Sequence, residues 1–448
     1  MMTTESNEAL PAETIRNHPA EKETLTAGGY LTLLRNNQNY RRLWLAQVIS
    51  QLGDWFSLAA VIALITRYAG SAEAISGLLI LRLGPVLVLS PFAGVLADRF
   101  NRRNLMIGAD LSRVVFALGF LLVSSPDQLW LIYVLTVGQF SLSSVFDPSR
   151  NALIPAITSP EERVAANALG SLTWSVLLAV GAALGGLSTG LIGLEISFIL
   201  DALSFVGSAA LVAGIPAVMG RIAQQGGQRQ SLRVFKDLLE GFSYLRQNPP
   251  IFGYTLIKPL AAISSGVFFS IMALQAYRVY PLGQNGSISL GLLYLAIGIG
   301  SGVGPLLFGA ILRRSGETRQ NLQRLVSLGF MLYGLGWGLY AFTGNLWLAV
   351  SLVILAELGG GSNWVFSTTL LQLGTEENFR GRVFSVEASL LTLLNIISAL
   401  VGGFMLDKLK WPVELTGGSL SGLTMLVGFI WLVGTGFAAR RLALRPAE

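Results

Sequence analysis

The chain contains no cysteine and almost no histidine. Among 448 residues, cysteine is absent and His18 is the single histidine. Without cysteine there is no disulfide framework, no thiolate nucleophile and no cysteine metal site. His18 lies in the polar N-terminal segment, so a histidine proton relay inside the apolar part of the chain is also excluded. We therefore expect no metal site, no cofactor and no enzymatic nucleophile, base and orienter set.

Charge is scarce as well. Charged residues make up 12% of the chain, against about 25% in soluble domains, whereas 52% of the residues are hydrophobic. No apolar run typical of a cleaved signal peptide follows Met1. A window of about 19 residues predicts twelve apolar spans, each near the roughly 20 residues that a membrane-crossing helix needs. They begin near Leu43, Ala74, Leu105, Leu129, Val164, Glu195, Ile251, Ser287, Gln323, Leu346, Val383 and Gly417. The shortest is predicted to end at Phe146.

The basic residues are distributed unevenly among the segments between these spans. With a cytoplasmic N-terminus, 22 lysines and arginines lie in the near-membrane inside segments. Four lie outside: Arg67, Arg278, Lys408 and Lys410. The positive-inside rule therefore predicts that both termini are cytoplasmic. The net charge of +6 is explained in the same way, because these basic residues lie near anionic lipid at the membrane surface. A nucleic-acid partner is not needed to explain it.

The sequence repeats itself across a polar middle segment. GAALGG at Gly181 is answered by SALVGG at Ser398, and ERVAAN at Glu162 by GRVFSV at Gly381. Two parallel six-helix halves are therefore predicted. The domains follow: a disordered tail over 1–40 with a short helix near its end, bundles over 41–219 and 251–440, a linker with an amphipathic helix over 220–250, and a tail over 441–448.

One decapeptide between spans two and three, GVLADRFNRR at 94–103, resembles the loop motif of the major facilitator superfamily of transporters. SQLGDWF in span one, RNALIPAI with AANAL around span five, and RGRVFS before span eleven resemble its third drug:proton antiporter group, which includes macrolide efflux pumps and exporters of catecholate siderophores. The resemblance covers nearly all of residues 35–440. It implies an all-α membrane protein of twelve transmembrane helices in two pseudo-symmetric bundles, with the substrate site between them.

The decapeptide also permits a physical interpretation. Its glycine allows close helix approach, and its aspartate can accept hydrogen bonds from free amides at the start of span eleven when the cytoplasmic side is closed. The resemblance implies a conformational latch; a simple positive-inside anchor is the alternative. The predicted latch residues are Gly94, Asp98, Arg99, Arg102, Arg103, Gly381 and Glu387. The second copy of the motif carries Arg313 at the aspartate position, so the predicted latch is asymmetric.

Charged residues within spans are costly and mark function. Asp54 and Glu357 each lie about eleven residues into their spans, near mid-membrane, and we predict that they couple transport to protons; permanent helix–helix hydrogen bonding is the alternative. Arg82 needs a partner on another helix, and Asp54 is the candidate. Asp110 and Arg113 share a helix face and are predicted to form a structural pair, Lys258 is predicted to extend to the surface, and Asp201 has no assigned role.

The resemblance implies that spans one, four, seven and ten line a central cavity. Aromatic and amide side chains there suit a large, partly apolar ligand better than a sugar; packing between helices or against lipid is the alternative for each. The candidates are Trp55, Phe56, Phe140, Phe268, Phe269, Gln275, Asn363, Trp364 and Phe366. Gly181–Gly186 resembles the antiporter motif of span five, with Ala182 replacing proline, and predicts tight packing on span eight.

Together these features predict a monomeric, proton-coupled exporter of an amphiphilic small molecule in the plasma (inner) membrane. Its expected partners are the substrate, protons and membrane lipid. Two alternatives stay open: a lysophospholipid or metabolite facilitator of the same fold, and a transport-inactive membrane receptor or scaffold.

Overall fold

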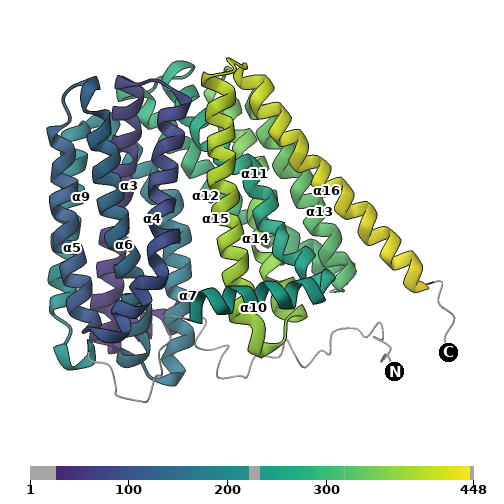
Figure 1. Ribbon diagram of the computed structural model, residues 1–448, viewed down its shortest axis with the longest axis horizontal. Coiled ribbons are helices and arrows are strands. Elements are labelled where there is room, and N and C mark those ends of the chain that lie inside the picture. Colours follow the sequence, from purple (N-terminus) through teal and green to yellow (C-terminus); the bar gives the residue numbers. More distant parts are fainter. Residues whose placement is uncertain (1–26, 221–232, 317, 444–448) are drawn as a thin grey trace.

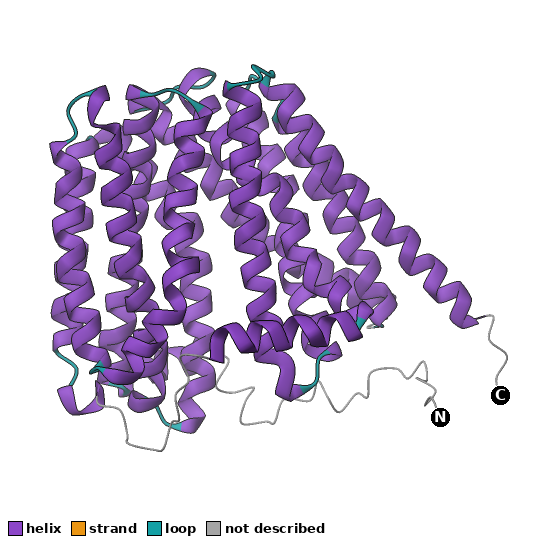
Figure 2. Ribbon diagram, viewed as in Figure 1, coloured by secondary structure: helices purple, strands orange, loops and turns teal. Residues whose placement is uncertain are grey.

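A computed structural model describes residues 27–220, 233–316 and 318–443, apart from the side chains at some positions inside helices. Within these ranges all regular structure is helical (Figure 2). The predicted tails therefore lie largely outside the described residues. Of the predicted N-terminal tail, the structure describes a short helix, α2 (Ala27–Asn36), whose Leu33 is buried against the first bundle.

The N-terminal half contains six membrane-length segments. They are α3 (Gln38–Tyr68), α4 (Ala72–Arg99), α5 (Arg102–Gly119), α6 (Leu129–Ile157), a segment made of α7 (Pro160–Val176), a π-helical turn (Leu177–Gly181) and α8 (Ala182–Leu191), and α9 (Leu194–Ala213). Asparagine side chains cap two of these helices: Asn37 accepts from the Tyr40 amide at the start of α3, and Asn101 accepts from the Asn104 amide at the start of α5. Such caps satisfy amides that have no partner within the helix.

The C-terminal half has the same number of long helices, preceded by a shorter one. Helix α10 (Arg233–Gln247) comes first, followed by α11 (Pro249–Arg278), α12 (Ser287–Ser315), α13 (Arg319–Tyr340), α14 (Leu346–Gly374), α15 (Glu377–Asp407) and α16 (Val413–Ala443). Figure 1 shows the two halves side by side, with α10 lying across one end of the second half. We call this the α10 end; the described termini also lie there, and the loops after α3, α11 and α15 lie at the opposite end.

Two details differ from the sequence prediction. By length and composition, eleven segments of the described chain are apolar enough to cross a membrane, and α13 is not among them, although it is a 22-residue helix within the second half. Helix α6 continues to Ile157, past the predicted end at Phe146. The helix continues through Pro148, because helices in membranes tolerate proline when neighbouring groups compensate the lost hydrogen bond.

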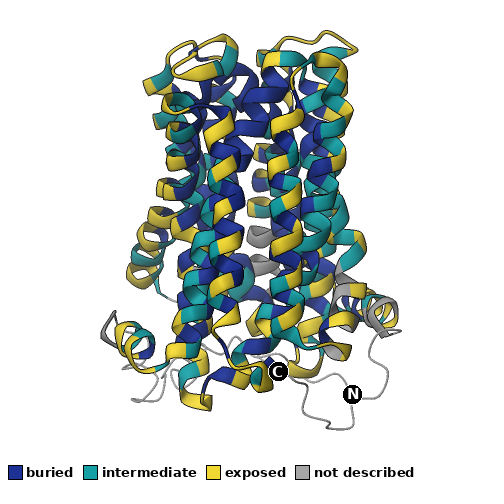
Figure 3. Cartoon of the chain, turned by 90° about the vertical axis from the view of Figure 1, so that its left-hand side faces the viewer, coloured by how far each residue is buried: buried dark blue, intermediate teal, exposed yellow. Residues whose placement is uncertain are grey.

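The packing between the halves follows a pseudo-two-fold pattern. The second helix of the first half, α4, packs on α15, the fifth helix of the second. In the reciprocal contact, α12 packs on α8, the end of the fifth segment of the first half. Exposed residues, yellow in Figure 3, lie on the outward sides of the helices, and many are large and apolar, such as Val115 and Leu306. An outer surface of this kind suits contact with lipid.

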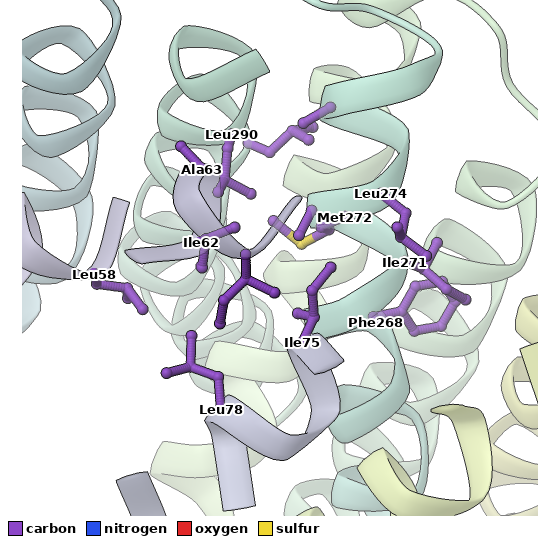
Figure 4. Packing of buried hydrophobic residues seen from close by; sticks show 14 of the residues in the cluster. Leu58, Ile62, Ala63, Ile75, Leu78, Phe268, Ile271, Met272, Leu274 and Leu290 are labelled. Atoms are coloured by element: carbon purple, nitrogen blue, oxygen red, sulfur yellow. The ribbon is translucent and has the colours of Figure 1, made fainter. Parts of the chain in front are cut away.

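The buried apolar residues show which end of the molecule is closed. One cluster crosses between the halves near the opposite end, where Leu58–Ile65 of α3 and Ile75 and Leu78 of α4 meet Val267–Ala276 of α11 (Figure 4). At the α10 end each half has a separate apolar cluster, one around Tyr40 and Met106 and the other around Ile251 and Val383. The halves are therefore joined at the opposite end and separated at the α10 end.

Candidate functional site: a cavity between the halves

A cavity of about 730 Å³ lies between the two halves. Helices α3, α6 and α7 and the π-helical turn line it from the first half, and α12 and α14 from the second. The lining begins at Tyr40, near the α10 end of α3, and reaches Gln51 and Glu357. Its size is within the range of small-molecule sites, roughly 300–1,000 Å³.

The cavity wall combines aromatic, amide and charged side chains. Trp44, Trp174 and Trp364 contribute apolar surface. Trp174 and Trp364 are each about half exposed. The polar lining residues are Gln47, Gln51, Arg150, Asn151, Asn167, Ser175, Ser301 and Glu357. One cation from the first half, Arg150, and one carboxylate from the second, Glu357, are the charged members of this lining.

Glu357 is a partly buried carboxylate in this wall. It lies eleven residues after the start of α14, which corresponds to a depth of about 17 Å from the opposite end. The Ser301 hydroxyl donates to its Oε2 at 3.4 Å, and among the described side chains no cation lies within ion-pair distance. Such a group can exchange a proton or accept a ligand cation, because no fixed positive charge holds it ionised.

Asp54, the other predicted coupling residue, lies in a different environment. Its Oδ1 is 2.6 Å from Nη2 of Arg113, and Arg113 also lies 3.4 Å from Asp110. Asp54 borders a water-sized hollow of about 10 Å³ inside the first half, together with Arg82 and Phe140. The predicted Asp110 and Arg113 pair therefore exists, but it includes Asp54.

Arg82 has an aromatic partner. Its guanidinium lies over the ring of Phe140 at 4.4 Å from the centroid, a favourable cation–π contact. No carboxylate lies within ion-pair distance of it among the described side chains, although Asp54 borders the same hollow. This hollow, bordered also by Thr136 and Gln139, is separate from the large cavity.

Most of the predicted cavity residues lie outside the large cavity, and Trp364 is the one that lines it. Phe268 is stacked on Trp337 at 4.6 Å, within the apolar cluster that joins the halves, and Phe269 packs against that cluster. Gln275 donates to the Ala341 carbonyl oxygen and accepts from the Tyr280 hydroxyl. The remaining candidates lie as follows: Trp55 is edge-on to Tyr294, Phe56 is half-buried, Phe140 contacts Arg82, Asn363 is buried near Gly329, and Phe366 is buried near Phe308.

Sequence reasoning missed most of the lining that the structure provides, although a signal was present. Arg150, Asn151 and Ile154 lie in RNALIPAI, Asn167 lies in AANAL, and Gln51 lies in SQLGDWF. These are three of the stretches that carry the group resemblance. Stretches that identify a group of relatives therefore supply part of the cavity wall.

The predicted latch residues are only partly described. The side chains of Gly94 and Asp98 lie outside the described residues. Arg99 is exposed, Arg102 donates to the carbonyl oxygens of Ala97 and Ala152, and Arg103 donates to that of Ala213. Gly381 is exposed, with open space where a Cβ would lie.

Glu387 contacts a partner that the sequence did not suggest. Its Oε2 is 3.1 Å from Nζ of Lys258. The same ammonium group donates to the Thr368 hydroxyl at 2.9 Å and lies 4.6 Å above the ring of Trp364. The prediction that Lys258 extends to the surface is thus wrong, because three partners within the second half satisfy its ammonium group while it is buried.

At the opposite end, polar contacts add to the apolar contact between the halves. Lys408 pairs with Glu73 at 3.2 Å, and the Glu73 amide donates to Asp407 Oδ2 at 2.5 Å. The hydroxyls of Ser76 and Ser270 lie 2.9 Å apart. We call these contacts, together with the shared apolar cluster, the seal. They close the cavity at the opposite end.

Comparison with known proteins supports this architecture. Residues 43–387 match the Major Facilitator Superfamily. The chain is 26% identical over 417 residues to the uncharacterized MFS-type transporter YfiS of Bacillus subtilis (strain 168), covering 91% of this chain and 96% of that protein. It is 23% identical over 380 residues to macrolide efflux protein A of Streptococcus pyogenes (82% and 89% covered), and 26% identical over 385 residues to the putative bacilysin exporter BacE of Bacillus subtilis (strain 168) (85% and 90% covered).

Solved structures show the same fold. A bacterial homologue of the iron transporter ferroportin, in an inward-facing state, superposes with a TM-score of 0.68 at 17% identity, over 88% of this chain and 98% of that one. A bacterial homologue of the lysosomal transporter Spinster, also inward-facing, gives 0.62 at 16% identity, over 90% and 94%. The match to the family over well more than half of the chain, with this fold and a cavity between two halves, shows that the protein belongs to the major facilitator superfamily and is a multi-pass membrane transporter of small molecules.

Proposed function

We propose that this protein exports an amphiphilic small molecule by proton-coupled alternating access. The observation that carries the proposal is the 730 Å³ cavity between the halves, which the seal closes at one end. A site that is accessible from one end and closed at the other is what one state of an alternating-access cycle requires. Both sides of the cavity come from one chain, so a monomer suffices for the cycle.

We place the α10 end in the cytoplasm and the protein in the plasma membrane. The segments at this end carry most of the lysines and arginines near the membrane, as the positive-inside rule requires of cytoplasmic segments. Helix α10 supports this placement, because Leu239 and Phe242 are exposed on it together with Lys236. A helix with this combination suits the boundary between anionic headgroups and acyl chains.

The lining supports an amphiphilic cargo. Tryptophan faces such as those of Trp174 and Trp364 can contact an apolar body, while the amides of Gln47, Gln51 and Asn167 can orient a few polar groups. Relatives named for macrolide efflux and for bacilysin export agree with outward transport of such molecules. Neither name identifies the cargo of this chain.

Glu357 is the proposed point of competition between the cargo and a proton. It lies in the cavity wall without a described cation within ion-pair distance. In the state open to the cytoplasm, a cargo with a cationic group can displace its proton. In the state open to the other side, protonation can displace the cargo, which couples export to proton entry.

We also retain the latch proposal. In the state with an open α10 end, Gly381 at the start of α15 has free space around it, as expected for a latch that is not engaged. The contacts of Arg102 and Arg103 tie the loop after α4 to the first half, so this loop would move with that half when the α10 end closes. Asp98→Asn is expected to weaken closure at the α10 end; equal populations of the two states in variant and parent would argue for the simple anchor.

Flux measurements test the proposed function. Purified protein in liposomes is given radiolabelled erythromycin, a macrolide with a cationic amine, with and without an imposed pH gradient. We expect accumulation that depends on the gradient, and loss of this dependence in Glu357→Gln, with Glu195→Gln as the control because Glu195 is an exposed carboxylate. If neither erythromycin nor a panel of cationic and zwitterionic amphiphiles shows gradient-dependent flux, the proposal is wrong.

A further inference from the structure

A charged cluster lies inside the first half, away from the large cavity. Arg113 is buried at its centre, with Asp54 at 2.6 Å, Asp110 at 3.4 Å and the Ser50 hydroxyl at 3.2 Å. Its guanidinium also lies 3.9 Å from the ring centroid of Phe205. The Ser208 hydroxyl donates to the second oxygen of Asp110 at 2.6 Å. Arg113 therefore places a positive charge in direct contact with Asp54 and Asp110.

Asp201 of α9 belongs to the same region but has no such partner. Its side chain is fully buried. Oδ2 accepts from the Gln139 amide at 3.0 Å, whereas Oδ1 has no hydrogen-bond partner among the described protein atoms. Oδ1 faces the α3 backbone at Gly53, where a Cβ would lie 2.8 Å from it. A carboxylate that is buried and incompletely hydrogen-bonded is strongly disfavoured, and it avoids this cost by taking up a proton.

The charges of the cluster lead to the same conclusion. The groups that face Asp201 from the packed helices are Asp54 and the neutral Ser57 of α3, Arg82 of α4, Arg113 of α5, and the neutral Gln139 of α6. Asp110 of α5 joins them through its contact with Arg113. Both arginines keep their charge. Asp147 and Arg150 of α6 also interact with this cluster. If all four carboxyl groups were ionised, it would contain four negative and three positive charges. A single added proton makes it neutral. Among the described side chains, neither Asp147 nor Asp201 has an arginine within ion-pair distance, and Asp201 is the buried one of the two.

We propose that Asp201 is a proton-binding residue of this transporter, and that Asp54, Arg82, Arg113 and Gln139 position it. The reaction is a protonation equilibrium at a carboxyl oxygen: one O–H bond forms when the proton arrives and breaks when it leaves. The hollow of about 10 Å³ bordered by Asp54, Arg82 and Gln139 has room for a single water molecule. Asp54 borders this hollow, and its side chain is 26% exposed. A proton can therefore move by way of Asp54 between the hollow and the surroundings of the cluster.

This inference rests on the proton coupling proposed above but assigns the proton to a different residue from Glu357. Glu357 faces the cargo in the cavity, whereas Asp201 is enclosed within the first half. Protonation of Asp201 cannot compete with the cargo directly and must act through the packing of α3 against α9, where Gly53 contacts Asp201 and Ser204.

Infrared spectroscopy of the intact protein in lipid tests the proposal without transport. We expect a carbonyl-stretch band of a protonated carboxyl group near neutral pH, which shifts on exchange into heavy water. A component of this band should disappear in Asp201→Asn and persist in Glu195→Gln, a change at an exposed carboxylate of the same helix. A spectrum of Asp201→Asn that matches the parent spectrum would overturn the proposal.

A second variant keeps the carboxyl group, so it remains informative if Asp201→Asn does not fold. Gln139→Leu removes the donor to Oδ2, and the Asp201 band is expected to move to higher frequency as the carbonyl loses its hydrogen bond. An unchanged band in this variant refutes the assignment. If erythromycin flux in the parent ignores the pH gradient while the Asp201 band is present, the proposed function fails and the proton site stands.

Discussion

The contact between α8 and α12 gives a sharp test of alternating access. At Gly186 of α8, an added Cβ would lie 2.7 Å from Cα of Gly291 on α12 and still closer to the Ser287 carbonyl oxygen. Real Cβ contacts of this length essentially do not occur, and both neighbouring atoms are backbone. Gly186→Ala therefore has to push the two halves apart near the opposite end, where the seal lies.

The expected size follows from the cost of overpacking. Extra atoms in a well-packed contact cost about 1–3 kcal/mol, and this cost falls on the state in which the opposite end is closed. If the open state relieves it fully, the equilibrium shifts toward opening by roughly 5- to 150-fold. Gly422→Ala is the matched control, because a Cβ at Gly422 of α16 meets nothing within 4 Å and the gain in helix propensity is similar.

The absence of cysteine makes the assay simple. Ser76→Cys introduces a single thiol inside the seal, where Ser76 is buried beside Ser270. A membrane-impermeant thiol reagent added from outside should label it faster in the Gly186→Ala background than in the Gly422→Ala background, by a factor in the range above. Equal labelling rates in the two backgrounds would show that the α8 and α12 contact does not control opening.

Two further predictions follow from the ion pairs. Lys258→Met leaves the buried Glu387 without a cation, so the free energy of unfolding in detergent should fall by about 3–5 kcal/mol and recover largely in the double variant with Glu387→Gln; a loss below about 1 kcal/mol contradicts the pairing. Glu73→Ala removes the ion pair with Lys408, in which both side chains are 59% exposed. An exposed pair of this kind contributes at most about 1 kcal/mol. Labelling of the Ser76→Cys thiol should then change by less than about fivefold, and a larger change would mean that this pair, and not the apolar cluster, holds the seal.

The sequence predicted the helices far better than the faces that they present. Long apolar runs separated by polar loops located the spans, since membrane helices need about 20 apolar residues. Helices that are apolar on every side, however, give little periodic contrast between inner and outer faces. Phe268 and Gln275 are on a helix predicted to line the cavity, but Phe268 packs in the apolar cluster of the seal and Gln275 donates to the Ala341 carbonyl oxygen beside it. Only contacts with neighbouring helices decide which side of such a helix meets water.

For the charged residues too, the sequence predicted a local contact but not the contacts between helices. The spacing of Asp110 and Arg113 by three residues was enough to predict their pair. The third member, Asp54, lies 59 positions from Arg113, and Lys258 and Glu387 are 129 positions apart. No local rule connects residues so far apart in the sequence, because the arrangement of the helices in the bundle determines such contacts. The environment of Asp201 was hidden for the same reason, since it is built from α3, α4, α5 and α6.

Helix α3 connects the three parts of the molecule that an export cycle has to coordinate. Near the α10 end it carries Gln47 and Gln51, which line the cavity. One turn further along, Asp54 contacts Arg113 and Gly53 contacts Asp201. Beyond these, Leu58–Ile65 form part of the seal. A tilt of this single helix therefore changes the cargo site, the proton cluster and the closed end together. Because Gly53 leaves no space between α3 and Asp201, a change in the charge of Asp201 acts on α3 directly, and the link between proton and cargo needs no contact between Asp201 and the cargo.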